Sequence, residues 1–396
     1  MLSSRPTATA GSLNPPMDAP TTPGELLAQM VSFDTVNRNF GGRPGGEAAL
    51  AAHLEKLAQG WGLRARRCPV GAGSDYNLLL TCEAVPEGEW LLFESHLDTV
   101  NIEGMTIDPL GGKIEGGRLY GRGACDTKGT GAAALWALRE YARGPARPRN
   151  VGLLFALDEE ARMQGAQAFA RTELKEFLPC LRGIIVGEPT GLRPIVAHNG
   201  AVRWRTITHG VAVHSSDPTK GKSAITAMLQ VVAALEERFI PLATRRHPLT
   251  GRAAASVNVI RGGTAVNIIP ARCEIEIDRR MAPGETADQI WRERDAALAG
   301  LAVEHDSLYV APALGEELSR DFHAWLAPIL TRNGVDPTPA GAPYVTDASH
   351  YAAAGAPAIV LGPGNLAQAH NKDEWLALDQ LDLGVAVYGA LMGATL

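Results

Sequence analysis

Residues 90–98 have the sequence WLLFESHLD, an apolar run that ends in a histidine and an aspartate. The apolar residues at 90–93 favour a buried strand. Side chains two positions apart in a strand share one face, so His96 and Asp98 lie together at its end. Asp98 is placed to accept the second ring N–H of His96, which would fix the imidazole tautomer and make the histidine a better metal ligand.

Three acidic clusters follow at intervals of about 30 residues, the length of one βα crossover unit. They centre on Asp126, on the pair Glu159 and Glu160, and on Glu188. Parallel strands end at the same edge of an open sheet, where such proteins bind their ligands. We therefore expect these side chains to meet in one crevice. A fifth candidate, His370, follows much later in the chain.

A segment of different texture fills the gap before His370. Residues 202–311 alternate strands with two charged helices in the order βαββαβ, the ferredoxin-like pattern. This order predicts a catalytic domain at 21–201 and 312–396, interrupted by a lid or dimerisation domain at 202–311. The expected strands are 77–80, 90–93, 151–156, 184–186, 202–208, 255–261, 272–278, 301–306 and 358–361, and the expected helices are 46–59, 132–141, 224–238, 286–298 and 318–332, with two more beginning near 22 and 381.

The composition argues against nucleic acid and membranes as partners. The 396 residues include 37 Lys and Arg against 43 Asp and Glu, for a formal net charge of −6. No stretch approaches the roughly 18 apolar residues of a membrane helix. Five cysteines without a C-x-x-C pair argue against a disulfide framework, so we expect a reducing cytoplasm. Residues 1–20 are polar and proline-rich, and we expect a disordered tail there without a secretion signal.

The candidate side chains form a donor set of imidazoles and carboxylates without a thiolate. This set suits zinc, cobalt or manganese at a hydrolytic centre better than a structural zinc site. The adjacent Glu159 and Glu160 allow one carboxylate to bind metal while the other acts as a base. Taken singly, each cluster has an ordinary alternative, such as an exposed turn for the Glu159 and Glu160 pair.

Two glycine-containing stretches fail as nucleotide sites. Residues 121–123, GRG, begin like a dinucleotide loop, but Asp126 occupies the position of the third glycine. Residues 220–223, KGKS, end like a phosphate loop, but Ser216 stands where the earlier glycine is required. No G-x-S-x-G elbow exists either, so we reject nucleotide-binding and serine-hydrolase interpretations.

Five ordered motifs together resemble the co-catalytic metallopeptidase family that contains acetylornithine deacetylase, succinyl-diaminopimelate desuccinylase, glutamate carboxypeptidase and aminoacylase. The likeness runs from about residue 22 to the end of the chain and is greatest to the acetylornithine deacetylase branch. It implies a zinc-exopeptidase-like catalytic domain, with a mixed sheet flanked by helices, and an inserted ferredoxin-like α+β lid or dimerisation domain. The motifs are SHLDTV at 95–100, LYGRGACDTKG at 119–129, DEE at 158–160, GEPT at 187–190 and AHNKDE at 369–374.

The resemblance implies two divalent metal ions, zinc first, with cobalt or manganese as alternatives. Asp126 would bridge them. One ion would also be held by His96 and Glu188, and the other by Glu160 and His370. Asp98 would orient His96, and Glu159 would be the general base that takes a proton from the metal-bridged water and hands it to the leaving amine.

The resemblance also assigns residues of the inserted segment. His214 matches a family histidine that reaches the active site of the partner subunit and stabilises the oxyanion, which makes a homodimer the expected assembly. Asn267 and Arg280 match positions that bind the substrate carboxylate, a task suited to the bidentate fork of arginine. His198 and His350 lie near family motifs, and we expect them either to support the metal ligands from behind or to pack in the interior.

Three positions depart from the family pattern. Asn101 replaces a common proline and Thr127 a common methionine, and neither change removes a metal ligand. Glu94 replaces a small or neutral residue on the face of His96. Its simplest interpretation is a surface acid, and the alternative hypothesis is that it meets a cationic substrate side chain.

The sequence therefore predicts an amidohydrolase that removes an acyl group, acetyl first, from an N-acyl-L-amino acid. N-acetylornithine is the first substrate to test. A dipeptidase or carboxypeptidase would use the same centre, because such a site could cleave any amide whose leaving amine bears a carboxylate. The third alternative is a binding protein without activity, against which the presence of Glu159 beside a full ligand set argues.

Overall fold

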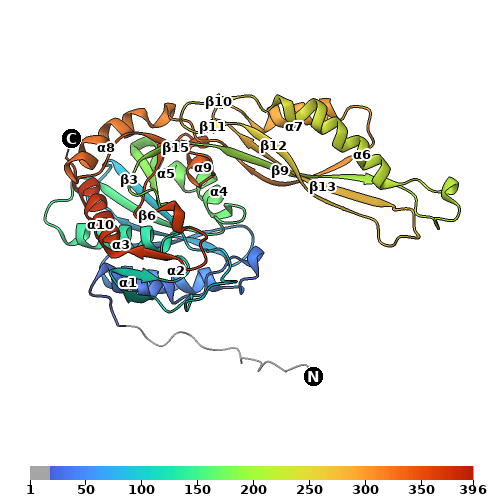
Figure 1. Ribbon diagram of the computed structural model, residues 1–396. Coiled ribbons are helices and arrows are strands. Elements are labelled where there is room, and N and C mark those ends of the chain that lie inside the picture. Colours follow the sequence, from blue (N-terminus) through green and yellow to red (C-terminus); the bar gives the residue numbers. More distant parts are fainter. Residues whose placement is uncertain (1–17, 396) are drawn as a thin grey trace, which may run out of the picture.

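The computed structural model in Figure 1 describes residues 18–395, in which the two largest sheets have eight and four strands, beside a three-stranded sheet (β17-β5-β4) and a two-stranded one (β10-β11). Of the tail expected at 1–20, the first 17 positions lie outside the described residues. The larger sheet and its helices form one body, and the smaller sheet with its two helices extends away from it. Among residues 18–395, no helix combines the length and apolarity that a membrane crossing requires.

The larger sheet is mixed, as the resemblance implied. Its eight strands follow the order β1-β2-β6-β3-β7-β16-β8-β15, and its four central strands run parallel. The outer pairs β1–β2, β2–β6 and β16–β8 are antiparallel. The strands are β1 (Arg64–Pro69), β2 (Tyr76–Cys82), β3 (Trp90–His96), β6 (Asn150–Ala156), β7 (Leu181–Val186), β8 (Ile195–His198), β15 (Ala340–Ala342) and β16 (Ala358–Val360).

Helices cover both faces of this sheet and bury it in two apolar clusters. Every residue of β6 is buried, because the strand has a helical layer on each side. One layer contains α1 (Pro23–Val31), α2 (Gly46–Gly60), α3 (Lys128–Arg143), α8 (Arg320–Arg332) and α10 (Leu378–Gly393), and the other contains α4 (Gln164–Arg171), α5 (Leu174–Phe177) and α9 (Ala348–Ala353).

The smaller sheet has the ferredoxin-like order β12-β13-β9-β14, with antiparallel pairing throughout. Its two helices pack on one face around the fully buried Trp204. Along β13, buried residues alternate with more exposed ones, so the other face of the sheet is open. The elements are β9 (Gly200–His209), α6 (Ala224–Ala234), β12 (Ala254–Gly262), β13 (Arg272–Met281), α7 (Ala287–Ala297) and β14 (Glu304–Ala311).

The sequence pattern missed the short or polar elements. β1 is rich in arginine, and β8 and β15 are too short to show a hydrophobic period. The strand expected at 301–306 lies later, at Glu304–Ala311. The other short strands that the pattern missed are β4 (Lys113–Glu115), β5 (Arg118–Tyr120), β10 (Arg246–His247), β11 (Gly251–Arg252) and β17 (Trp375–Ala377).

Candidate active site

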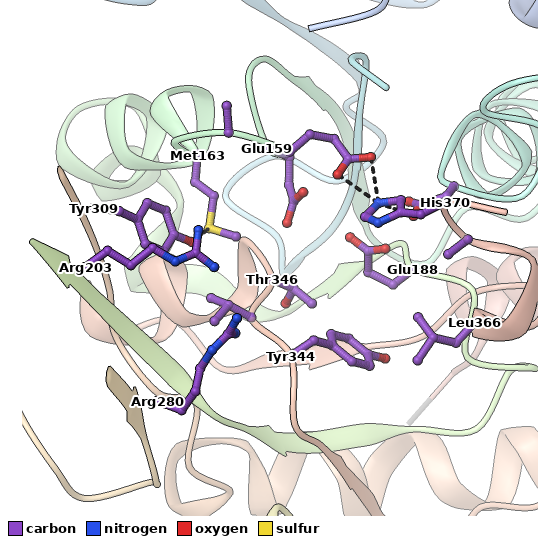
Figure 2. A pocket seen from close by; sticks show the side chains of 15 residues that line it. Glu159, Met163, Glu188, Arg203, Arg280, Tyr309, Tyr344, Thr346, Leu366 and His370 are labelled. Atoms are coloured by element: carbon purple, nitrogen blue, oxygen red, sulfur yellow. Dashed lines mark hydrogen bonds and ion pairs between the residues drawn. The ribbon is translucent and has the colours of Figure 1, made fainter. Parts of the chain in front are cut away.

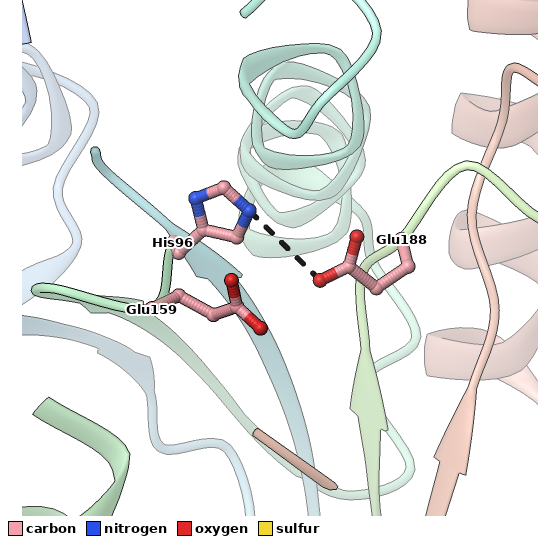
Figure 3. Close-up of side chains that lie close together, drawn as sticks. All are labelled: His96, Glu159 and Glu188. Carbon is pink, nitrogen blue, oxygen red and sulfur yellow. Dashed lines mark ion pairs between the residues drawn. The ribbon is translucent and has the colours of Figure 1, made fainter. Parts of the chain in front are cut away.

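The predicted ligands lie at one edge of the larger sheet, where its parallel strands end. His96 is the last residue of β3, and Asp126 lies just before α3. Glu159 follows β6, and Glu188 follows β7. His370 arrives from the loop between β16 and β17. Figure 3 shows three of these side chains, His96, Glu159 and Glu188, pointing toward one another.

The two carboxylate oxygens of Asp126 face two different histidines. Its Oδ1 lies 3.2 Å from His96 Nε2, and its Oδ2 lies 3.4 Å from His370 Nε2. Glu188 Oε1 is 3.9 Å from His96 Nε2, whereas Glu160 Oε2 is 3.0 Å from His370 Nε2. The structure thus brings together all five residues that the resemblance named as ligands, in two groups that share Asp126.

Four of these residues, together with Glu159 and without His370, satisfy a geometric test for metal binding. Ligand atoms of His96, Glu159 and Glu188 lie within 4.8 Å of one another, as do those of His96, Asp126 and Glu160. Each of these five side chains except Glu160 belongs to a buried residue, and Glu160 is partly buried. A donor set of imidazole and carboxylate suits zinc, cobalt or manganese.

The electrostatics of the cluster call for cations. Burial raises the pKa of Glu188 well above its usual range, and the charge of Asp126 adds to this. Burial and the same neighbour raise the pKa of Glu160. Burial opposes ionisation of Asp126 too, but its hydrogen bond with His96 leaves its pKa lowered. Because so many acids crowd one buried site, divalent ions fit it by charge as well as by donor type.

Asp98 contacts His96 differently from the expected arrangement. The closest acceptor for His96 Nδ1 is the backbone carbonyl of Asp98 at 2.9 Å, while the carboxylate oxygen lies 3.5 Å away. The carboxylate instead accepts hydrogen bonds from the backbone N–H groups of Glu159 and Glu160, at 3.0 and 3.1 Å, and from Asn37 Nδ2 at 2.7 Å. Asp98 therefore fixes both the imidazole and the turn that carries the two glutamates.

Glu374 was quoted in a family motif but given no role, and the structure supplies one. It is fully buried and accepts hydrogen bonds from the backbone N–H groups of Gly123, Cys125 and Asp126, at 2.7 to 3.0 Å. It also pairs with Arg122 Nη1 at 2.7 Å. Glu374 thus holds the loop that presents Asp126 to both histidines.

A cavity of about 400 Å³ opens above the ligand cluster and is shown in Figure 2. Arg280, the residue for which the resemblance implied binding of the substrate carboxylate, lines this cavity. Several lining residues were not singled out in the sequence, because all but Ala369 lie outside the motifs and in segments far apart in the chain. These are Ala161, Met163, Arg203, Tyr309, Tyr344, Val345, Thr346, Leu366 and Ala369.

His214 and Asn267 do not line this cavity. The two residues lie side by side on the smaller sheet's body, where His214 forms a bridge with Ile268 and Ser215 N–H donates to the carbonyl of Asn267 at 3.0 Å. His214 Nδ1 lies 2.8 Å from the hydroxyl of Ser216. Within one chain, these two predicted residues therefore sit together but away from the ligand cluster.

Glu94 does not fit either interpretation of its sequence position. It is 3% exposed, so the surface interpretation is wrong. It does not line the cavity, so it cannot meet a substrate side chain there. Burial raises its pKa well above the usual range, and the charge of Asp347 adds to the effect. Glu94 points into the interior because β3, the strand that carries it, is covered by helices on both faces.

His198 is fully buried and His350 is half-buried, positions compatible with packing or supporting residues. His198 Nδ1 lies 2.9 Å from the carbonyl of Asn199, and its Nε2 lies 3.1 Å from the hydroxyl of Thr346, which lines the cavity. Burial lowers the pKa of His198 to about 4, so the ring is neutral at neutral pH.

Known proteins resemble the chain over most of its length. Acetylornithine deacetylase of Edwardsiella ictaluri is 31% identical over 368 residues, which cover 89% of this chain and 92% of that protein. A metallo-carboxypeptidase of the M20 family from Sulfolobus solfataricus has the same fold, with a TM-score of 0.74 at 16% identity over 93% of this chain and 97% of that one. A dinuclear metal-binding M20 peptidase of Bacillus subtilis also has this fold, with a TM-score of 0.66 at 14% identity over 93% of this chain and 95% of that one.

The family profile described as peptidase family M20/M25/M40 matches residues 92–394. This span contains every residue of the ligand cluster and both strands that carry the cavity arginines. The chain belongs to peptidase family M20/M25/M40 and is a hydrolase of amide bonds.

Proposed function

We propose that the protein is a metal-dependent amidohydrolase that removes an acyl group from an N-acyl-L-amino acid. The observation that carries the proposal is the position of Asp126, whose two oxygens face two separate donor groups at the floor of a cavity. The likeness to acetylornithine deacetylase supports deacylation, and makes N-acetylornithine the reference substrate. A role in amino-acid metabolism, such as arginine biosynthesis, would follow from that substrate.

Two divalent ions would occupy the cluster, zinc first, with cobalt or manganese as alternatives. His96, Glu188 and Asp126 would hold one ion, and Glu160, His370 and Asp126 the other. The dinuclear relative from Bacillus subtilis supports this number. When bound, such ions lower the pKa of water toward 7 and polarise the carbonyl under attack.

Glu159 is the proposed general base. It lines the cavity and is 9% exposed, and its carboxylate forms no hydrogen bond or ion pair with another described residue. Burial raises its pKa well above the usual range, which makes it a stronger base once ionised. Its carboxylate accepts the proton of the attacking water and then donates it to the leaving amine nitrogen. Asp98 positions it through the backbone N–H of Glu159.

Arg280 is the proposed partner of the substrate carboxylate, because it lines the cavity opposite the ligand cluster. His214 and Asn267 are proposed to act on the active site of a second subunit, since they lie together at a distance from their own. The proposed assembly is therefore a homodimer that forms through the smaller sheet's body. His214 would stabilise the oxyanion there, and Asn267 would contact the substrate.

The cytoplasm is the proposed location, and the cysteines support it. All five are free, and only Cys180 is exposed. Proteins of oxidising compartments commonly pair such residues.

A substrate panel tests the proposed activity. Metal-stripped protein is reconstituted with zinc and offered N-acetylornithine, N-acetylmethionine and the dipeptide Ala-Ala. We expect hydrolysis of an N-acyl amino acid that a chelator abolishes. Faster cleavage of the dipeptide would favour the dipeptidase alternative, and activity that survives complete metal removal would contradict the proposal.

A further inference from the structure

Two arginines of the smaller sheet point into the active-site cavity. Arg203 lies on β9 and Arg280 on β13, and these strands pair in antiparallel register. Figure 2 shows both side chains on the side of the cavity away from His370. The resemblance had assigned a role to Arg280 alone. Arg203 therefore adds a second permanent positive charge to the place where substrate binds.

One aspartate orients both guanidinium groups. Asp278 Oδ1 lies 3.3 Å from Arg203 Nε, and Asp278 Oδ2 lies 3.0 Å from Arg280 Nε. Arg203 also stacks over the ring of Tyr309, with 5.1 Å between the guanidinium carbon and the ring centre. The hydroxyl of Tyr309 donates to Met163 Sδ at 3.3 Å. Two cations share one acid, so the group keeps a net positive charge.

The free ends of the arginines are available to a ligand. Each arginine donates to Asp278 through its Nε group. Among residues 18–395, the terminal Nη groups of the two arginines donate no hydrogen bond to a side chain. Each arginine therefore keeps the paired N–H groups that bind a carboxylate in bidentate fashion.

Within residues 18–395, no acid lines this side of the cavity to receive a cationic substrate. The acids of the lining are Asp126, Glu159, Glu160 and Glu188, all within the ligand cluster. Glu94, the remaining candidate, is buried away from the cavity. An ammonium group such as that of ornithine would therefore meet two guanidinium groups, which repel it.

We propose that Arg203 and Arg280 bind two carboxylates of one substrate, so that the enzyme acts on dianionic N-acyl amino acids. The inference rests on the proposed amidohydrolase function and narrows its substrate class. The second carboxylate belongs either to the amino-acid side chain, as in an N-acyl glutamate, or to the acyl group, as in an N-succinyl amino acid. Both present the same chemistry to Arg203.

Matched substrate pairs distinguish these sources. N-acetylglutamate is compared with N-acetylglutamine, and N-succinylalanine with N-butanoylalanine, because each pair differs in one carboxylate. We expect the zinc-reconstituted enzyme to favour the dianionic member of at least one pair by about 10- to 100-fold in kcat/KM, as charge-assisted hydrogen bonds provide. The pair that shows the preference identifies where the second carboxylate lies.

The variant Arg203→Gln should reduce that preference at least about tenfold, through KM. The control is Arg261→Gln, since Arg261 on β12 pairs with Glu274 and Glu276 but does not line the cavity. It should keep the wild-type ratio. Calorimetric titration of the metal-free protein with glutarate gives a second measurement, in which Arg203→Gln should bind about tenfold more weakly.

Equal or faster cleavage of the neutral members, or of N-acetylornithine, would overturn the inference and leave the amidohydrolase function intact. If Arg203→Gln lost glutarate affinity but the wild-type enzyme hydrolysed no N-acyl amino acid, carboxylate binding by the paired arginines would stand and the proposed function would be contradicted. An unchanged ratio and unchanged glutarate affinity in Arg203→Gln would remove Arg203 from the site.

Discussion

The two sides of the cavity are built in different ways. On the metal side, His96, Glu159 and Glu188 come from the ends of buried parallel strands and Asp126 and His370 from loops. Hydrogen bonds from backbone N–H groups to Asp98 and Glu374 hold the Glu159 turn and the Asp126 loop. On the arginine side, Arg203 and Arg280 project from strands of a sheet with one open face, and their side chains are 43% and 33% exposed. The first arrangement holds the reacting groups in place. In the second, a single substitution of an arginine can change which substrate is preferred.

The difference follows from how each sheet is covered. Helices lie on both faces of the larger sheet, so most of the groups at its edge are buried, although the His370 side chain remains 55% exposed. Helices lie on only one face of the smaller sheet. A residue on the open face, such as Arg203, changes without disturbing a packed core. We therefore expect substitutions on the metal side to remove activity or stability, and substitutions on the arginine side to change selectivity.

The largest effect should come from Glu159→Gln on the metal side. We expect kcat to fall about 10⁴-fold, because the variant cannot accept the proton of water. The metal content should not change, which elemental analysis of the purified variant checks. Turnover near the wild-type rate would exclude Glu159 as the general base.

Glu374→Ala tests the support of the Asp126 loop. The substitution leaves Arg122 buried without its carboxylate and removes the acceptor of three backbone N–H groups. We expect the free energy of unfolding to fall by about 3 to 5 kcal/mol, measured by urea denaturation. The control Glu115→Ala breaks the exposed pair with Lys113 and should change it by less than about 1 kcal/mol. Similar losses of unfolding free energy in both variants would show that the buried pair stabilises the protein no more than the exposed pair does.

His214→Ala should lower kcat about 10²-fold, the usual effect of losing one oxyanion donor. Mixing it with Glu159→Gln separates action within one chain from action across a dimer. If His214 serves the partner, a mixed dimer contains one complete site, so subunit exchange should restore activity. Absence of any recovery after exchange, confirmed by differently tagged subunits, would place His214 in its own chain's site or outside catalysis.

The smallest expected effect is the loss of unfolding free energy at acidic pH that comes from His198, which lies behind the cavity. Burial lowers the pKa of His198 to about 4, below that of the unfolded chain, so the folded state binds fewer protons. Its contribution is therefore complete above about pH 6.5 and is lost as the pH falls toward 4. Between pH 7.5 and pH 5, wild type should lose about 2 kcal/mol more unfolding free energy than His198→Gln. Identical losses in urea titrations at the two pH values would contradict this.

The sequence revealed the metal side far better than the arginine side. His96, Glu159 and Glu188 stand at the ends of strands that have an apolar signal, whereas Asp126 follows the short strand β5, which the pattern missed. The two oxygens of Asp126 face His96 and His370 in the structure, an orientation that spacing alone could not give. The role of Asp98 was only partly predicted, since its carboxylate contacts two backbone N–H groups that no pattern reveals.

Other residues had no sequence signal because partners distant in the chain create their roles. Arg203 enters the cavity only through the register between β9 and β13 and its contact with Asp278. Glu94 looked like a surface acid, because a single polar residue in an apolar strand does not reveal a layer of helices on each face. Such errors concern tertiary packing, which local patterns do not contain.

Metal content tests the central claim, that Asp126 joins two ion sites, most directly. Wild-type protein and the variants Asp126→Ala and Asp217→Ala are reconstituted with zinc, and the zinc bound per chain is measured by elemental analysis. Asp217 is an exposed acid paired with Lys220 and serves as the control. We predict about two ions per chain in wild type and in Asp217→Ala, and fewer than one in Asp126→Ala. Two ions retained in Asp126→Ala, or a single ion in wild type, would contradict the account.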